Sequence, residues 1–372
     1  NEDQCERGKI PRLKGPQQDY QGDCMGWNFT ASANSPARNR PFDHLGHGTH
    51  VAGIIAAKRG NGVGIAGICD HIRILPLKIV GRGSNESDET ADAEETQAFS
   101  DQVAKAIRYA THRGAQVINL SLGWPKVANV ELLTQAIQEA LNHNVTIVAA
   151  SGNNGHSTRI YPCAIEGVIC VGAINNDGTM ASFSNYGGHV DVLAPGRSIL
   201  STYPNSPLNS KTPLIFSSPG YEVKNGTSQA APFVSGLVAL LKMKYPGMSN
   251  REVRARILSS TRKVYTDEPF QDMNEATALA GLVQFDQALT IQPQPVLRPK
   301  LKTLDLIPFH PQSLQAQFQL EVTNDWSPSQ DVDLKIISKN KDIKLAKDVF
   351  HLGVLKSGES KKVLLQVQLA NA

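Results

Sequence analysis

Residues 226–232 read Gly-Thr-Ser-Gln-Ala-Ala-Pro and place Ser228 directly before an apolar segment with helical spacing. The apolar side chains that recur at this spacing are Ala230, Val234, Leu237, Val238 and Leu241. They predict a buried helix that ends before Pro246, and Pro232 is compatible with it because it falls in the first turn. Ser228 is then expected at the positive end of the helix dipole. A serine there is either a helix cap or a nucleophile, and only a nucleophile requires a base, an acid and oxyanion donors elsewhere in the chain.

Two of these partners are found at the ends of other predicted elements. His47 opens the sequence His-Gly-Thr-His-Val-Ala-Gly, and the small and apolar residues that follow predict a helix with the imidazole at its start. Asn153 comes directly after the apolar strand predicted at 145–150, where its carboxamide is placed to donate to an oxyanion. We therefore take His47 as the candidate base and Asn153 as the candidate donor for Ser228.

Composition describes a globular chain of 372 residues, long enough for one large domain and a smaller one. The net charge of +3 comes from 37 basic and 34 acidic residues, and it indicates neither a nucleic-acid partner nor an anionic membrane surface. No apolar run reaches the roughly 18 to 20 residues that span a bilayer. The chain begins with Asn1 and not with Met, so we expect a processed protein or a fragment, and the lack of a leader is no sign of a cytosolic protein.

The five cysteines are too few for a scaffold built on disulfides. Cys163 and Cys170 flank a short loop that enters a strand, and Cys5 and Cys24 bracket an irregular segment. Either pair is a possible disulfide in an oxidising compartment. Cys69 is left over, and we interpret it as a buried, inert thiol.

Residues 70–245 alternate between strand-like and helix-like segments, which predicts an α/β domain with a parallel sheet covered by helices. Strands are expected at 72–80, 116–122, 145–150, 168–173 and 190–193, and further helices at 99–113, 130–142 and 250–261. The acidic segment 84–95 is expected to be a solvated surface insertion, with cation binding as the alternative.

The composition changes at residues 292–299, where three prolines predict a linker. Strict alternation of apolar and polar residues at 314–322, 332–336 and 363–369 then predicts a C-terminal antiparallel β-sandwich over residues 300–372, after a first domain at 1–291. A carbohydrate- or surface-binding module is the alternative for this part, but no aromatic platform beyond Trp326 is visible, so we favour a structural appendage.

Six segments occur in the order found in one peptidase family: 47–53, 121–123, 151–155, 181–187, 194–196 and 226–232. On these residues the chain resembles the subtilisin-like serine peptidases, or subtilases, over roughly residues 20–262. The competing α/β-hydrolases would show Gly-x-Ser-x-Gly and place the serine before the histidine, and this chain does neither.

The resemblance implies a parallel-sheet, three-layer fold and a serine endopeptidase that acts on proteins or peptides, with Ser228 as the acylated nucleophile and His47 as the general base. It implies that Asn153 and the Ser228 backbone N–H form the oxyanion hole. It also implies a secreted, periplasmic or extracellular protein, and a propeptide inhibitor upstream as a further partner. It further implies that the substrate backbone lies as an added strand along an edge formed by Ser121, Leu122 and Gly123. Ala150, Ser151 and Gly152 would then form a wall of the first specificity pocket.

The family carries its triad acid in Asp-Thr-Gly or Asp-Ser-Gly before the histidine, and this chain departs from that pattern. The aspartates before His47 are Asp3, Asp19, Asp23 and Asp43, and none of them precedes such a pair. Residues 26–29 match a stretch that in many subtilases lies between the aspartate and the histidine. We therefore expect an N-terminally incomplete sequence that lacks the strand of the catalytic Asp. The alternative is an inactive pseudopeptidase that binds peptides in the retained groove.

The sequence does not decide the roles of several further residues. Gln229 stands where many subtilases have Met, and Trp124 either narrows a pocket or packs as a surface aromatic. Asn61 lies where some subtilases have a calcium loop, so calcium is a possible cofactor and no other is expected. Zinc at His47 and His50 is disfavoured because no His-Glu-x-x-His motif is present.

Overall fold

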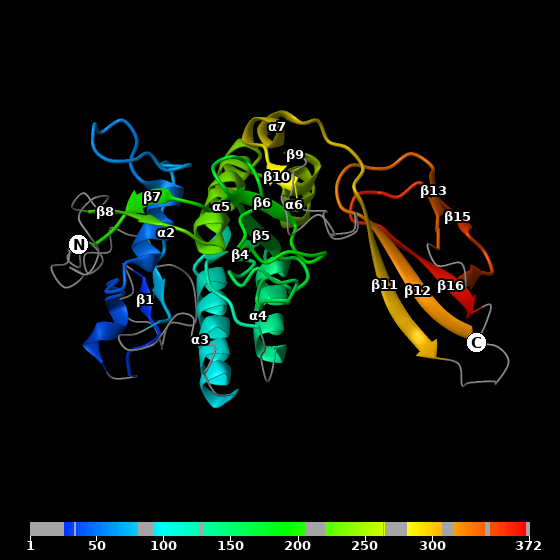
Figure 1. Cartoon of the computed structure of the whole chain (residues 1–372), viewed down its shortest axis with the longest axis horizontal. Helices are drawn as coiled ribbons and strands as arrows, with labels where there is room; N and C mark the ends of the chain where they lie inside the picture. The colour runs from blue at the N-terminus through cyan, green and yellow to red at the C-terminus, as the bar shows by residue number, and fades with distance from the viewer. Residues whose placement is uncertain are drawn as a thin grey trace. The chain divides into compact units, whose positions relative to one another are not determined.

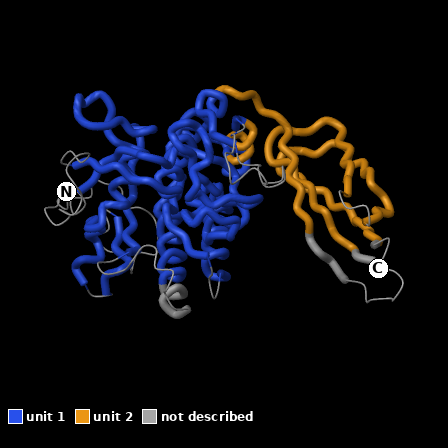
Figure 2. The backbone as a smooth tube through the Cα atoms, viewed as in Figure 1, with its two compact units in different colours: residues 1–253, 260–289 blue, residues 254–259, 290–372 orange. Residues whose placement is uncertain are grey.

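The computed structural model describes residues 26–32, 35–80, 93–125, 130–204, 220–262, 264, 281–306, 315–338 and 343–369. The chain forms two compact units (Figure 2), one made of Asn1–Val253 and Ser260–Leu289 and the other of Arg254–Ser259 and Thr290–Ala372. The domain limits at residues 291 and 300 stay a prediction. No helix within the described part of the chain is both long and apolar enough to cross a bilayer.

A six-stranded sheet forms the centre of the first unit (Figure 1). Its strands, in spatial order, are β3 (Val117–Leu120), β4 (Thr146–Ala150), β5 (Ile169–Ile174), β6 (Val192–Pro195), β10 (Gly281–Val283) and β9 (Thr261–Arg262). All neighbours pair in parallel except β9, which runs antiparallel to β10 at the end of the sheet. Every residue of β4 and β5 is buried, as expected for strands that are covered on both faces. The predicted α/β class is confirmed.

Helices cover this sheet on both faces. On one face, Ile147 and Ala149 of β4 share a core cluster with α3 (Ala93–His112) and α4 (Glu131–Asn142). Side chains alternate along a strand, so Val148 points to the opposite face. There α5 (Thr227–Lys244) packs against β3, β4, β5 and β6. The remaining helical elements of this unit are η1 (Pro36–Asn39), α2 (His47–Ala56), the start of α6 (Asn250–Ser259) and α7 (Phe285–Thr290), with α7 ending at the unit boundary.

Helix α5 is mostly apolar and has no distinct polar face, which explains why most of it is buried. Ala230, Val234, Leu237 and Leu241 have no exposed surface. The helix starts after Gly226 and ends at Lys244, ahead of Pro246, as the sequence predicted. Pro232 is accommodated near its beginning.

The prediction of a strand over residues 72–80 is wrong in its length and in the sheet to which the strand belongs. Only Leu77–Lys78 (β2) is extended, and it pairs in parallel with Trp27–Asn28 (β1) in a separate two-stranded sheet. Pro76 has no N–H to donate and serves only as an acceptor, from the Trp27 N–H at 3.1 Å. The sequence also missed the hairpin of β7 (Ile199–Thr202) and β8 (Tyr221–Lys224), whose short strands lack a long apolar run.

Smaller differences concern the helix ends. Helix α3 begins at Ala93, inside the segment expected to be an acidic insertion, and the part of that segment at 84–92 lies outside the described residues. Helix α6 ends at Ser259 and is followed by β9.

The second unit consists of antiparallel sheets. One contains β11 (Leu297–Leu306), β12 (Gln315–Asn324), β16 (Ser360–Leu369) and β14 (Ile343–Leu345), and the other pairs β13 (Val332–Lys335) with β15 (Val349–Gly353). Their inward side chains form one core around Leu320, Val322, Leu352, Leu355 and Leu365. A shared core between two sheets is the arrangement of a sandwich, so the alternation seen in the sequence identified these strands correctly.

Truncation of a buried leucine in α5 tests the importance of this helix for stability. We expect Leu237→Ala to lower the free energy of unfolding by about 2–5 kcal/mol, because it leaves a cavity between the helix and the sheet. Met243→Ala in the same helix removes a side chain that is 48% exposed and should cost much less. Urea denaturation of both variants makes the comparison, and equal losses would contradict a buried α5.

Candidate active site

The loop before His47 is held by the carboxylate of Asp43. Its Oδ1 accepts hydrogen bonds from the N–H groups of Leu45 (3.0 Å) and Gly46 (2.7 Å), and its Oδ2 accepts from the N–H (2.8 Å) and hydroxyl (2.7 Å) of Thr49. Burial works to raise the pKa of Asp43, but these hydrogen bonds outweigh it, and the pKa is lowered below its ordinary value of 3.8. The negative charge also lies at the positive end of α2. Asp43 therefore caps the helix that begins with His47.

His50 lies one turn further along α2 and is fully buried. Its Nε2 is 3.1 Å from the carbonyl oxygen of Ile199 and 3.0 Å from that of Glu222, one on each strand of the β7–β8 hairpin. Burial lowers its pKa to about 4, so the ring is neutral at pH 7. This histidine joins α2 to the hairpin, and its Nε2 is occupied by carbonyl groups.

Hydroxyl groups of β7 and of the residue after it bind the first turn of α2 in the same way. Ser201 donates to the carbonyl of His50 (2.7 Å), Thr202 to that of Thr49 (2.9 Å), and Tyr203 to that of Leu45 (2.8 Å). A Cβ on Gly53 would overlap the Thr202 hydroxyl, which explains why the motif at 47–53 ends in glycine.

Ser228 lies in the first turn of α5, and strand β8 leads directly into it. Because Glu222 of β8 contacts His50 and lies only a few residues before Ser228, the starts of α2 and α5 belong to one region of the molecule. The two helices also pack against each other. His47 and Ser228 are both half-buried, so neither is sealed from solvent.

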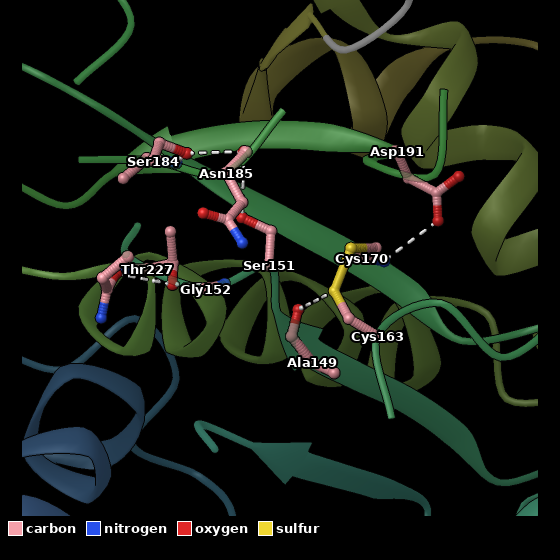
Figure 3. The surroundings of a disulfide bond; sticks show 11 residues. Ala149, Ser151, Gly152, Cys163, Cys170, Ser184, Asn185, Asp191 and Thr227 are labelled. Atoms are coloured by element: carbon pink, nitrogen blue, oxygen red, sulfur yellow. Dashed lines mark hydrogen bonds between the residues drawn. A yellow bond between two sulfur atoms is a disulfide. The ribbon is translucent and has the colours of Figure 1, made fainter. Parts of the chain in front are cut away.

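Asn153 lies against the same helix start. Its Oδ1 accepts hydrogen bonds from the backbone N–H of Thr227 (2.8 Å) and from the Thr227 hydroxyl (2.9 Å). That hydroxyl in turn accepts from the N–H of Gly152 (3.1 Å), as Figure 3 shows. Since both donors engage Oδ1, the oxygen and the nitrogen of the carboxamide are distinguished by their partners. These bonds leave the amide nitrogen for other acceptors, and Thr227, which holds the oxygen, directly precedes Ser228 in the sequence.

Ser121 connects the end of β3 to the nucleophile position. Its hydroxyl donates to the Ser228 carbonyl at 2.8 Å, and the Ser228 hydroxyl donates to the Ser121 carbonyl at a longer 3.3 Å. The chain of bonds continues inward, because Asn119 donates to the Ser121 hydroxyl (2.9 Å) and Ser235 of α5 donates to Asn119 (2.8 Å). These bonds tie the sheet to the helix at Ser228, and neither inner residue was predicted from the sequence.

The fully buried Asn185 supports the loop that carries Asn153. Its Oδ1 accepts from the N–H of Asn154 at 2.9 Å, and its backbone carbonyl accepts from the hydroxyl of Ser151 at 3.3 Å. Figure 3 shows Ser184 and Asn185 beside Ser151 and Gly152. The motif at 181–187 thus holds the loop that carries Asn153, a role that its polar residues could have suggested since they lie between apolar strands.

The six predicted substrate-contacting residues fall on two segments. Ser121, Leu122 and Gly123 follow β3 and are half-buried or exposed. Ala150 and Ser151 are buried at the end of β4, and Gly152 is half-buried. Parallel neighbours end at the same edge of a sheet, so the two segments start from adjacent positions.

The roles of Trp124 and Gln229, which the sequence left open, are clarified by their burial. Trp124 is 8% exposed and packs edge-on against Phe99 in the main core, with ring centroids 5.0 Å apart, so it is not a surface aromatic. Gln229 is buried beside Gly226, behind the nucleophile.

The cysteine predictions have separate outcomes. Cys163 and Cys170 form a disulfide, shown in Figure 3, and Cys69 is a buried free thiol. The pair of Cys5 and Cys24 lies outside the described residues.

The loop at 60–64 does not provide a calcium site built on side chains. Asn61 uses its Oδ1 to accept the N–H of Val63 at 3.0 Å, which closes a local turn. Within the described ranges, no three Asp, Glu, His or Cys side chains come together as a metal site. Calcium bound through the backbone carbonyls of this loop stays a prediction.

Residues 20–281 match the model of the subtilase family (peptidase S8). That match covers well over half of the sequence, and the chain belongs to the subtilase family.

Individual relatives agree with this assignment. The chain is 41% identical to a thermophilic serine proteinase of Bacillus sp. strain AK1 over 224 residues, which are 60% of this chain and 49% of that protein. It is 38% identical to subtilisin BL of Lederbergia lenta over 219 residues, 59% of this chain and 71% of that one. A solved protease structure from Pseudoalteromonas arctica superposes with a TM-score of 0.57 and 27% identity, covering 74% of this chain and 86% of its own. The matched region thus spans only about half of the first of these relatives.

Removing the Asp43 carboxylate should destabilise the fold in a pH-dependent way. We expect Asp43→Ala to cost about 1–2 kcal/mol at pH 7, because a helix loses its cap. The pKa of Asp43 is lower in the folded protein than in the unfolded chain, so this stability is complete above the unfolded pKa of about 4 and is lost as the pH falls through the folded pKa. The difference in the free energy of unfolding between variant and wild type, measured by urea denaturation, should therefore disappear as the pH falls below about 4.

Asp177→Ala is a matched control for this experiment. Asp177 also accepts the N–H (2.9 Å) and hydroxyl (2.7 Å) of a threonine two residues on, but it lies in an exposed turn and supports no helix. Removal of this carboxylate should lower the free energy of unfolding by less than removal of the Asp43 carboxylate. A loss at Asp43 that does not change between pH 7 and pH 3 would argue against the capping role.

Proposed function

We propose that this chain forms the peptidase domain of a serine endopeptidase that cleaves peptide bonds through an acyl-enzyme on Ser228. In this mechanism, Ser228 Oγ attacks the scissile carbonyl while His47 removes the hydroxyl proton. The tetrahedral intermediate then expels the amine, which receives the proton from His47. Water, deprotonated by His47 in its turn, hydrolyses the ester and restores the serine.

The observation that carries this proposal is the orientation of Asn153. Thr227, the residue directly before Ser228, holds the Asn153 Oδ1, so the amide nitrogen is not used in this anchor. The Ser228 backbone N–H, in the first turn of α5, is a second donor at the positive end of a helix. Donors that are fixed before the reaction stabilise an oxyanion without reorganisation at the transition state.

We further propose that the substrate is a protein or peptide that lies extended along Ser121, Leu122 and Gly123. The exposed backbone of Gly123 supports this mode, since an added strand needs free backbone groups and little side-chain bulk. A secreted or otherwise extracytoplasmic location is supported by the Cys163–Cys170 disulfide, because such bonds persist in oxidising compartments. A propeptide inhibitor stays a prediction from the family resemblance.

The acid that orients His47 is, in our proposal, not one of the residues of this sequence. No aspartate before His47 precedes Thr-Gly or Ser-Gly. Asp43 is the nearest carboxylate in sequence, but its two oxygens already accept hydrogen bonds from Leu45, Gly46 and Thr49. The absence of the acid motif is also the one observation in favour of an inactive, peptide-binding relative.

Labelling with a fluorophosphonate distinguishes the two functions. The protein, expressed together with any coding sequence upstream of Asn1, should be modified at Ser228 and at no other serine, and the reaction should be lost in His47→Ala. Mass spectrometry of the labelled peptide identifies the site. A folded protein that binds peptides but is not labelled would be the inactive relative.

Substitution of Asn153 tests the oxyanion donor. Asn153→Ala should lower kcat about 10²–10³-fold with little change in KM, a loss that was measured for this donor in subtilisin itself. Asn154→Ala, at the next position of the same loop, controls for disturbance of the backbone. Steady-state kinetics with a peptide p-nitroanilide measure both, and equal losses in the two variants would indicate damage to the loop and not the loss of a donor.

A further inference from the structure

The carbonyl group of Ser228 cannot make the hydrogen bond that is regular for its position in α5. In an α-helix, each carbonyl accepts from the N–H group four residues further along the chain. For Ser228 that residue is Pro232, which has no N–H group. The hydroxyl of Ser121, directly after β3, donates to this carbonyl at 2.8 Å. A residue that follows a strand of the sheet thus supplies the donor that Pro232 cannot supply.

The Ser228 carbonyl also fixes the direction of the hydrogen bonds behind it. Because a carbonyl only accepts, the Ser121 hydroxyl uses its proton for this bond and has only acceptor capacity left. Asn119 therefore presents its amide nitrogen, which donates to the Ser121 hydroxyl at 2.9 Å. The Asn119 Oδ1 then accepts from the Ser235 hydroxyl at 2.8 Å. Each bond determines the orientation of the next group, so these partners distinguish the oxygen of the Asn119 amide from its nitrogen.

The spacing of the four residues in the sequence explains how they meet. Asn119 and Ser121 are two residues apart, so they lie on the same face of β3 and its continuation. Ser228 and Ser235 are seven residues apart, which is about two helical turns, so they lie on the same face of α5. The helix packs against β3. Ser235 is 3% exposed and Ser228 is half-buried, so the hydrogen bonds lead from the buried body of the helix to its accessible start.

The side chain of Ser228 is held less firmly than its backbone. Its hydroxyl donates to the Ser121 carbonyl at 3.3 Å, which is longer than the roughly 2.5–3.0 Å usual for a hydroxyl donor. In the proposed reaction, this hydroxyl has to leave that carbonyl and give its proton to His47. The bond from the Ser121 hydroxyl involves only the backbone of Ser228, so the rotation of the side chain does not break it. The main chain, with the N–H proposed to bind the oxyanion, stays fixed meanwhile.

We propose that Ser121, Asn119 and Ser235 are positioning residues, which hold the backbone of Ser228 where its hydroxyl reaches His47 and its N–H faces the oxyanion. The Ser121 hydroxyl has this role in addition to the binding of substrate proposed for its backbone. Asn119 and Ser235 act through Ser121. The inference rests on the proposed peptidase function and adds to it the groups that hold the nucleophile in place.

Removal of the Ser121 hydroxyl tests the last of these bonds. Ser121→Ala, made in the protein with any upstream coding sequence included, keeps the backbone along which the substrate is proposed to lie. We expect kcat for a peptide p-nitroanilide to fall about tenfold while KM changes less than about twofold, because a displaced nucleophile slows the reaction without weakening binding. An unchanged kcat, with or without a higher KM, would contradict the positioning role.

Asn119→Leu tests whether the inner residues act through Ser121. Leucine has a similar size and no charge, but it has no group that donates to the Ser121 hydroxyl, which then loses its fixed orientation. We expect kcat to fall about threefold or more, and we expect no further fall when Asn119→Leu is added to Ser121→Ala. Losses that multiply in the double variant would overturn the action of Asn119 through Ser121.

Thr111→Val is the matched control. Thr111 is 6% exposed, and its hydroxyl donates to the Ile107 carbonyl at 2.9 Å within α3. Its substitution also removes one hydrogen bond from a hydroxyl to a backbone carbonyl, so it should lower the free energy of unfolding at least as much as Ser121→Ala. It should leave kcat unchanged.

Titration with a fluorophosphonate gives the concentration of reactive Ser228 and separates the two proposals. No labelling of the wild type would overturn the peptidase function. Labelling of the wild type, together with an unchanged kcat per labelled site in Ser121→Ala, would overturn the positioning role alone. If Asn119→Leu does not fold, Ser235→Ala replaces it: a fall in kcat that is absent in the Ser121→Ala background supports the role, and one that persists there contradicts it.

Discussion

The hydrogen bonds between Asn153 and Thr227 are the interaction on which the arrangement of the site depends. They connect the loop after a central strand of the sheet to the first turn of the buried helix α5. Parallel strands end at a common edge, and residues that follow β3 and β4 therefore meet there. The helix is mostly apolar and lies largely inside the molecule, and its first turn meets this edge of the sheet.

Around this contact, hydrogen bonds from buried or half-buried polar side chains position the loops. Asp43 fixes the turn before His47, Asn185 fixes the turn around Asn153, and Asn119 ties Ser121 to the body of α5. A buried polar group that loses its partner costs free energy, because water cannot replace the lost bond. This dependence on hydrogen-bond partners restricts the conformations of the loop before α2 and of the loop after β4.

Much of the fold could be predicted from local patterns. The apolar runs at 145–150 and 168–173 were identified as buried parallel strands, and the alternation at 314–322 as an antiparallel one, since burial on two faces or one face leaves a direct trace in the sequence. The prediction failed at 72–80, where an apolar run is interrupted by Pro76 and only two residues pair. The hairpin of β7 and β8 was missed because its strands are short and half-exposed, so no periodicity distinguishes them from a loop.

The sequence by itself determined the family, the order of the motifs and the helix that starts at Ser228, because these depend on residue types at short spacing. Only the tertiary structure decided which residues far apart in the chain touch. Ser235 reaches Asn119, and Ile160 fills the space between Gly123 and Gly152. Local periodicity reports the face on which a side chain lies but not the partner that it meets there. The hydrogen bonds that hold Ser228 and the packing of Ile160 against two glycines therefore became visible only once the strands and helices had been placed in space.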